Sequence, residues 1–320
     1  MQEFREVYPH VWKLTLPLPF ELESVNVYLV AIDGGWMLID TGMETDEAFE
    51  VLRNAMEQRG IAWREIRQIL LTHMHPDHIG MSRRLLELSG AELAMHEVEF
   101  RHLQLVTGGG RRIPWLDRVY REAGVPAPLE EKMEAHFFAV RKNFHDLTPD
   151  HLYSGNVRIQ TAIGPLEVIM ASGHSPGLIC LYSRERKVLF SADQMLERIT
   201  PNISWHPDRD MLQEYLTSLE GLSGLDVDLI LPGHYEPFSG HRAWIAKTGV
   251  HHRDRCGEIL NAVRRTPQTA HQMVAELWRK KLSPINHHFA VFEVLAHLEH
   301  MQRRGEVRHR SNDGALEWHE

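Results

Sequence analysis

The sequence is most informative at Thr72-His73-Met74-His75-Pro76-Asp77-His78. This stretch follows the apolar run Ile66 to Leu71, which predicts a buried β-strand, and it leads into a helix predicted over about Ile79 to Leu88. Four side chains able to bind a metal ion therefore cluster at the point where a strand turns into a helix.

The spacing within this stretch separates the four side chains into two pairs. His73 and His75 lie two residues apart beyond the strand, so their imidazoles can converge on one ion. Asp77 and His78 are adjacent in the first turn of the helix and point in other directions, so they can bind a second ion nearby. Imidazole and carboxylate groups hold zinc while leaving coordination positions open for water. The motif therefore predicts a site for two metal ions.

Two ions need more than four ligands, and three later turns supply candidates. Each turn follows a predicted strand, and loops at strand ends converge in α/β folds. The turns are Ser172 to Gly177 after the strand Leu166 to Met170, Ser191 to Asp193 after Val188 to Phe190, and Leu231 to His234 after the run Val227 to Leu231. We expect His174, Asp193 and His234 to complete the ligand set.

The N-terminal residues predict the elements around this site. Short strands are expected at Val11 to Leu16, Val25 to Ala31 and Trp36 to Ile39, with a hairpin turn at Asp33-Gly34-Gly35. Thr45 can cap a helix over about Glu47 to Arg59, and Gly60 can end it. Strands and helices that alternate in this order imply an α/β sandwich.

Composition limits the class of protein. The chain has 320 residues, which suits one large and one smaller domain, and it contains 22 histidines. Its N-terminus is polar, and no run approaches the ~20 apolar residues that span a bilayer. Cys180 and Cys256 are too few for a disulfide framework. We expect a cytoplasmic protein that has no membrane partner.

Charge and helical periodicity divide the chain near residue 240. Residues 241–310 hold 13 Lys and Arg against 6 Asp and Glu, whereas the whole chain has a net charge of −9. We predict a catalytic domain at residues 1–240, with a helical insertion at 97–150 that can act as a lid. Three helices and a hairpin are predicted at 241–320, which is a winged-helix-like order.

The metal-binding motifs and their order along the chain resemble those of the metallo-β-lactamase superfamily, in the broad branch that includes glyoxalase II and lactonases. The residues that carry the resemblance are Leu38-Ile39-Asp40-Thr41-Gly42, the motif from His73 to His78, His174, Asp193 and His234. The resemblance implies a four-layer αββα sandwich and a hydrolase.

The resemblance also assigns roles to the candidate residues. It places His73, His75 and His174 on one ion, Asp77, His78 and His234 on the other, and Asp193 as a bridge between both. Asp77 and Asp193 become the catalytic carboxylates. Asp40 would orient a ligand through hydrogen bonds, although its position before Gly42 also fits a simple turn residue.

The C-terminal part resembles, more narrowly, the helical tail of proteins like beta-lactamase-like protein 2. The matching segments are His251-His252-x-x-Arg255, Thr269-Ala270-His271 and Glu293 to Leu298. Three interpretations of this basic part stay open: it binds nucleic acid through phosphates, it packs beside the pocket mouth, or it forms a homodimer contact. His251 and His252 are not expected to bind metal, because the ligand set is already filled.

The expected chemistry is hydrolysis. Two divalent ions about 3.5 to 4 Å apart can share a hydroxide and polarise the scissile oxygen. We expect two Zn²⁺ ions, with Mn²⁺ or Fe²⁺ as alternatives, and a small ester, thioester or lactone as the substrate.

The other hypotheses are a metal-dependent endoribonuclease and a nucleic-acid-binding regulator with structural metals. Tyr182, Tyr235 and His206 are candidates for the leaving-group acid. A true β-lactamase is not expected, because no periplasmic signal is seen and a bridging Asp193 belongs to other branches.

Overall fold

The computed structural model describes residues 2–107, 114–141 and 146–320. These residues form two compact units. Unit 1 comprises Met1–Thr107, Lys142–Pro201 and Leu222–His241, and unit 2 comprises Gly108–Arg141, Asn202–Gly221 and Arg242–Glu320. Of the insertion predicted at 97–150, residues 108–113 and 142–145 lie outside the described residues. The chain therefore passes several times between the units.

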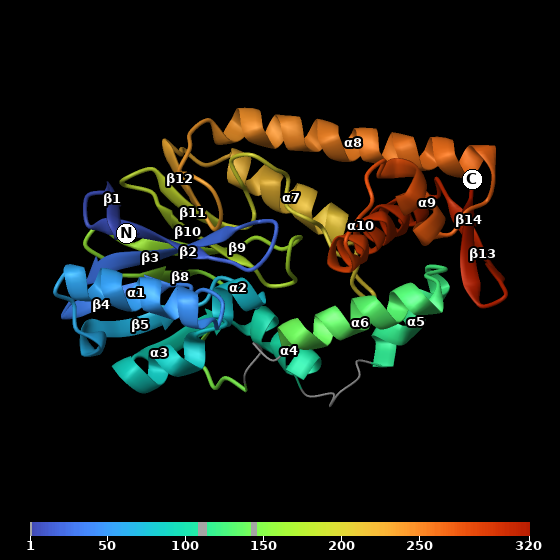
Figure 1. Ribbon diagram of the computed structural model, residues 1–320. Coiled ribbons are helices and arrows are strands. Elements are labelled where there is room, and N and C mark those ends of the chain that lie inside the picture. The colour runs from blue at the N-terminus through green and yellow to red at the C-terminus, as the bar shows by residue number, and fades with distance from the viewer. Residues whose placement is uncertain (1, 108–113, 142–145) are drawn as a thin grey trace. The chain divides into compact units, whose positions relative to one another are not determined.

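Unit 1 contains two β-sheets (Figure 1). The seven-stranded sheet has the order β1 (Arg5–Tyr8), β2 (Val11–Pro17), β3 (Ser24–Ile32), β4 (Gly35–Ile39), β5 (Ile66–Leu70), β6 (Glu92–His96) and β7 (His151–Tyr153). The five-stranded sheet has the order β12 (Leu229–Pro232), β11 (Val188–Ala192), β10 (Ile179–Ser183), β9 (Leu166–Met170) and β8 (Val157–Ile159). The predicted α/β sandwich is confirmed in this unit.

The core of unit 1 lies between the two sheets. Apolar side chains of both sheets form one buried cluster, which includes Val30 and Leu70 of one sheet and Leu181 and Leu231 of the other. The ring of Tyr28 meets that of Phe190 edge-on, with the centroids 5.5 Å apart. Removing this apolar surface from water is the main force that holds the sheets face to face.

Strand direction explains where the site forms. Strands β4, β5, β6 and β7 are parallel, and so are β11 and β12. The carboxyl ends of parallel strands lie at one edge of a sheet, so the residues that follow these strands gather there. Asp40 follows β4, and Asp193 follows β11.

Four helices of unit 1 follow its strands. They are α1 (Asp46–Gln58), α2 (Pro76–Ile79), α3 (Ser82–Ser89) and α4 (Glu97–Thr107), and a 3₁₀ turn, η1, spans Trp63–Glu65. The Thr45 side chain accepts a hydrogen bond from the amide of Ala48, as the sequence predicted. The helix predicted at 79–88 is instead two helices. At Gly80 the backbone runs so close to Met43 and Glu44 that a Cβ atom would collide with them.

Unit 2 is mainly helical. The helices that lie in its ranges are α5 (Pro114–Glu122), α6 (Ala127–Arg141), α8 (His241–Arg265, which starts at the boundary), α9 (Ala270–Leu277) and α10 (Pro284–Arg303), and α7 (Met211–Ser223) crosses its boundary. A hairpin of β13 (Arg308–Asn312) and β14 (Ala315–His319) ends the chain. The three predicted C-terminal helices and the hairpin are confirmed, whereas the winged-helix assignment stays a prediction.

No helix among the described residues is both long enough and apolar enough to cross a membrane.

Candidate metal centre

The seven predicted ligands all lie in unit 1, on segments that follow its strands. His73 and His75 come after β5, and Asp77 and His78 lie in α2. His174 follows β9, Asp193 follows β11, and His234 follows β12. The loops bring together side chains that are up to 161 positions apart in the sequence.

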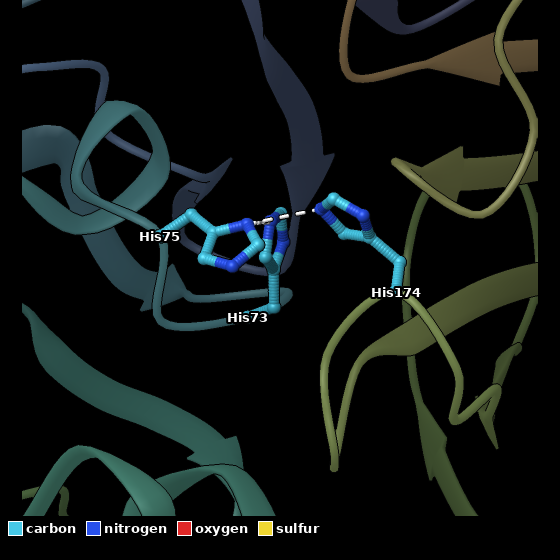
Figure 2. Close-up of side chains that lie close together, drawn as sticks. All are labelled: His73, His75 and His174. Carbon is cyan, nitrogen blue, oxygen red and sulfur yellow. Dashed lines mark hydrogen bonds between the residues drawn. The ribbon is translucent and has the colours of Figure 1, made fainter. Parts of the chain in front are cut away.

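Three imidazoles form the first group of potential ligands. The Nδ1 atom of His75 lies 3.0 Å from Nε2 of His73 and 2.9 Å from Nε2 of His174. Figure 2 shows the three rings turned toward one another. A tetrahedral ion with bonds of ~2.0 to 2.1 Å to nitrogen places its ligand atoms ~3.3 Å apart, so this spacing suits a metal ion.

The second group combines a carboxylate with two imidazoles. The Nε2 atom of His234 lies 3.3 Å from Oδ2 of Asp77, and Nε2 of His78 lies 3.7 Å from the same oxygen. The ligand atoms of Asp77, His78 and His234 all lie within 4.8 Å of one another. This group is therefore also close enough to bind one ion.

Asp193 lies between the two groups. One of its carboxylate oxygens is 3.6 Å from Nε2 of His174 and 3.2 Å from Nε2 of His234. The other oxygen is 3.4 Å from Nε2 of His78. A carboxylate in this position can contact an ion of either group, as the predicted bridge requires.

The backbone around Asp193 is shaped to bring it there. The pairing of β11 with β12 shifts register just before Asp193, and Ala192 has a positive φ of 46°. Irregular strand ends of this kind re-aim side chains next to active sites. Gly233 packs against Asp193, and any side chain at Gly233 would collide with Asp193 Oδ1.

Asp40 orients two of the histidines. Its Oδ2 atom accepts a hydrogen bond from Nδ1 of His78 at 2.8 Å and another from the Thr72 hydroxyl at 2.8 Å. Because the Thr72 hydroxyl has given its proton to Asp40, it must accept from Nδ1 of His73, 3.0 Å away. Both histidines therefore carry a proton on Nδ1 and direct Nε2 into the site, where it can bind a metal ion once it is deprotonated.

The loop that carries His234 is fixed by β3. Nδ1 of His234 donates to the carbonyl of Ser24 at 2.6 Å. The side-chain amide of Asn26 donates to the carbonyls of Pro232 and Tyr235, at 3.0 and 2.7 Å. Asn26 and Thr72 were not among the predicted site residues, because their role depends on contacts with distant parts of the chain.

The electrostatics of the site favour a cation. Burial alone would lower the pKa of His234, but the carboxylates of Asp193 and Asp77 raise it to about 10. Burial also opposes charge on His78, yet Asp193, Asp77 and Asp40 raise its pKa well above the usual value. At the first group burial prevails, and it lowers the pKa of His75 to about 3. The carboxylates therefore draw positive charge to His78 and His234, here as bound protons, and a divalent cation would displace those protons and take their place.

Three buried polar atoms at the centre of the site make no hydrogen bond within the described residues. They are Nε2 of His78, Nε2 of His234 and Oδ1 of Asp193. Buried polar atoms are nearly always satisfied, so such a cluster indicates a missing partner. Nitrogen and carboxylate donors in two groups with a shared carboxylate fit two divalent ions.

The three candidates for the leaving-group acid lie in different surroundings. The Tyr182 hydroxyl donates to the carbonyl of Asp226 at 2.7 Å, so its proton is already engaged. Tyr235 directly follows His234, and burial raises its pKa. His206 belongs to unit 2, where its Nδ1 donates to the carbonyl of Pro207 at 2.8 Å. Tyr235 is the candidate that lies next to a ligand in the chain.

Comparison with known families agrees with this geometry. Residues 21–234 match the family model described as Metallo-beta-lactamase superfamily. Residues 256–320 match the model described as Metallo-beta-lactamase-like, C-terminal domain. The chain belongs to the metallo-beta-lactamase superfamily.

Curated relatives give the class of reaction. The chain is 27% identical to the probable metallo-hydrolase YqjP of Bacillus subtilis over 282 residues, which cover 83% of this chain and 84% of the relative. It is 28% identical to acyl-coenzyme A thioesterase MBLAC2 of Gallus gallus, over 71% of this chain and 80% of that protein. The chain is accordingly a hydrolase of this superfamily.

Solved structures confirm the fold over nearly the whole chain. A metallo-beta-lactamase family protein from Thermus thermophilus matches with a TM-score of 0.86 and 26% identity, over 98% of this chain and 99% of that one. A beta-lactamase domain protein from Burkholderia ambifaria matches with a TM-score of 0.84 and 27% identity, over 99% and 94%. The metallo-β-lactamase fold predicted from the motifs is therefore confirmed.

Proposed function

We propose that this protein hydrolyses a small ester, thioester or lactone with the help of two divalent metal ions, most simply Zn²⁺. The single observation that carries the proposal is the position of Asp193, whose two carboxylate oxygens face different histidines. His73, His75 and His174 would hold one ion, and Asp77, His78 and His234 the other. When bound, such ions activate water as a nucleophile and polarise the bond that is cleaved.

The chain's own residues would prepare the site for this reaction. Asp40 and Thr72 hold the Nδ1 atoms of His73 and His78 in hydrogen bonds, which directs their Nε2 atoms into the site as potential ligands. The site lies at a buried strand edge, where Asp193 is only 5% exposed and His73 fully buried. Exclusion of water strengthens each electrostatic interaction with the reacting groups.

A thioester is our first choice among the substrates. It rests on the relative that is an acyl-coenzyme A thioesterase, which matches 71% of this chain. The fold by itself does not select among these substrates, because loops that follow strands support many substrates on one fold. Esters and lactones share the electrophilic carbonyl of a thioester, so they belong in the same test.

A substrate panel on purified, zinc-loaded protein tests this proposal. The panel contains acyl-coenzyme A thioesters of several chain lengths, aryl esters, lactones and single-stranded RNA. We expect turnover of at least one carbonyl substrate, inhibition by a chelator, and recovery when zinc is added back. The variant Asp193→Asn, prepared in parallel, controls for contaminating esterases.

Cleavage of RNA without turnover of any carbonyl substrate would overturn the proposal in favour of an endoribonuclease. That alternative rests on the net positive charge of residues 241–310. Several of those cations are already paired with acidic side chains, for example Arg264 with Glu320 and Arg310 with Glu317. Glu317 and Glu320 lie outside residues 241–310, so they offset part of the positive charge on which phosphate binding would depend.

The domain division at residue 240, the lid role of residues 97–150 and a homodimer remain proposals. Limited proteolysis with and without substrate tests the lid, because a closing segment becomes protected when it covers a ligand. Sedimentation measurements test the dimer.

A further inference from the structure

We propose that Glu99 is a positioning residue that sets the geometry of one of the two ion sites and leaves the other unaffected. Glu99 lies near the start of α4 and is fully buried. Its carboxylate joins the loop that carries His73 and His75 to the loop that carries His174. The inference rests on the proposed two-ion site, but not on the identity of the substrate.

Three hydrogen bonds support this role. Oε1 of Glu99 accepts from the amide of Met74 at 2.8 Å, and it also accepts from the Ser175 hydroxyl. Oε2 accepts from the amide of Gly177 at 2.6 Å. Met74 lies between His73 and His75 in the sequence, and Ser175 directly follows His174.

The cost of burying a carboxylate argues that these bonds are specific. A buried carboxylate without hydrogen bonds is strongly unfavourable, so its donors must be held in place. Hydrogen bonds to a charged acceptor are shorter and stronger than neutral ones. A single charged group that binds both loops therefore fixes the distance between them, and with it the spacing of the three imidazoles.

The close packing at Gly177 leads to the same conclusion. A side chain at Gly177 would collide with the backbone amide of Glu99. The loop after His174 and the start of α4 are thus in backbone contact, and the carboxylate of Glu99 adds hydrogen bonds to Ser175 and Gly177 across that contact. Of the second group, Asp77 and His78 lie in α2, where Asp40 bonds His78, and His234 lies on the loop after β12 that Asn26 holds.

Variants that retain only one ion site give a direct test. His234→Ala removes a ligand of the second group and keeps His73, His75 and His174. His75→Ala removes a ligand of the first group and keeps Asp77, His78 and His234. Glu99→Gln is then added to each, because the amide group of glutamine places a second donor against a backbone amide or the Ser175 hydroxyl. Zn²⁺ affinity is measured by competition with a chromophoric chelator at one neutral pH.

We expect Glu99→Gln to weaken zinc binding about 10- to 100-fold in the His234→Ala protein, which is the usual effect of losing a group that orients ligands. In the His75→Ala protein we expect a change of less than about twofold. Glu97→Gln is the matched control: it alters a carboxyl group on the same helix whose partner is Arg101 and should change neither affinity.

Equal losses in both proteins would overturn the proposal, because they would mean that Glu99 supports the fold as a whole. No loss in either protein would overturn it as well. If Glu99→Gln does not fold, Ser175→Ala replaces it, since it removes one of the three donors and should produce the same contrast at roughly tenfold. If neither parent protein binds zinc, the proposed metal site itself is wrong, whereas a failure to hydrolyse esters leaves this inference untouched.

Discussion

Two regions of this molecule hold buried histidines at nearly the same nitrogen-to-nitrogen separation, and they differ in the charge around them. In unit 1, His73 and His75 approach to 3.0 Å. In unit 2, Nδ1 of His252 lies 3.1 Å from Nε2 of His297. The first pair lies beside carboxylates that can bind a cation. Burial lowers the pKa of both histidines in the second pair, and the nearby Arg255 lowers it further.

The difference indicates what a group of histidines needs in order to serve as a metal site. Nδ1 of His297 donates to the carbonyl of Glu293 at 2.7 Å, so the pair in unit 2 forms a chain of ordinary hydrogen bonds. Within the described residues, every group of three close ligands belongs to unit 1. A third ligand and a negative charge, rather than the number of histidines, separate the two cases.

The largest effect should come from the residue shared by both ion groups. We expect Asp193→Asn to lower kcat by at least about 10²- to 10³-fold, the loss seen when one electrostatic contact to a transition state is removed. The variant should also bind less zinc, because each group loses an anionic ligand. Steady-state kinetics and elemental analysis measure the two effects. An unchanged zinc content together with unchanged kcat would mean that Asp193 is not a bridge.

Folding of Asp193→Asn needs its own control. The side chain lies at a strand end, and far-UV circular dichroism should show the native spectrum. A variant of unit 2 with the same change in charge, Asp210→Asn, should keep zinc content and activity, since Asp210 pairs with His300. If both variants lose zinc equally, the contrast between the units fails.

A smaller effect is expected at Asp40. The variant Asp40→Asn replaces one acceptor oxygen by a donor, so the chains to His78 and through Thr72 to His73 cannot both be satisfied. We expect a loss of about 10- to 100-fold in zinc affinity. Thr72→Val should weaken binding less, because it breaks only the chain to His73. The same chelator competition orders the two variants, and a larger loss for Thr72→Val would contradict the role given to Asp40.

Much of this candidate site could be predicted from the sequence because each candidate ligand lies next to a local signal. His73 to His78 follow an apolar run, and His174 and His234 each follow a glycine after a predicted strand. The apolar run reports burial on both faces of a parallel strand, and the strand end fixes where the loop begins. The seven candidates therefore needed no knowledge of the tertiary fold.

Apart from Asp40, which the family resemblance supplied, the residues that orient the candidate ligands could not be predicted in this way. Asn26 acts on the carbonyl of Pro232, 206 positions away, and Glu99 on a loop 76 positions away. Such side chains carry no local pattern, because their partners are defined only when the sheets pack together. The strands β6 to β8 and the helix α7 were missed for a related reason: they are short or weakly periodic, and tertiary packing decides them.

Acid should lower the free energy of unfolding of unit 2, because its buried histidines are neutral in the folded state. Burial lowers the pKa of His252 to about 2 and that of His297 to about 4, whereas an unfolded histidine titrates near 6.5. Below pH ~6.5 the unfolded chain therefore binds more protons than the folded one. Stability falls as the pH drops from there toward 4, by about 1.4 kcal/mol per pH unit for each proton.

The double variant His252→Gln/His297→Gln tests whether these two histidines cause the loss of stability in acid. It should flatten the pH dependence of the urea midpoint between about pH 6.5 and 4, measured with a chelator present so that metal binding does not contribute. The exposed His309 provides the control, because His309→Gln should leave the slope unchanged. A slope equal to that of the wild type in the double variant would show that other groups cause the acid sensitivity.

The smallest effect is expected at a third pair of histidines. Nδ1 of His271, in α9, lies 2.9 Å from Nε2 of His287, in α10, and both side chains are half-buried. This separation matches that of the candidate metal ligands in unit 1. We nevertheless expect His271→Gln to leave zinc content and activity unchanged and to alter the free energy of unfolding by about 0.5 to 1.5 kcal/mol, the net value of one hydrogen bond. Elemental analysis and urea unfolding measure both quantities. A loss of one zinc ion per chain would show that two imidazoles suffice for binding here, and the requirement for a third ligand and a carboxylate would then be wrong.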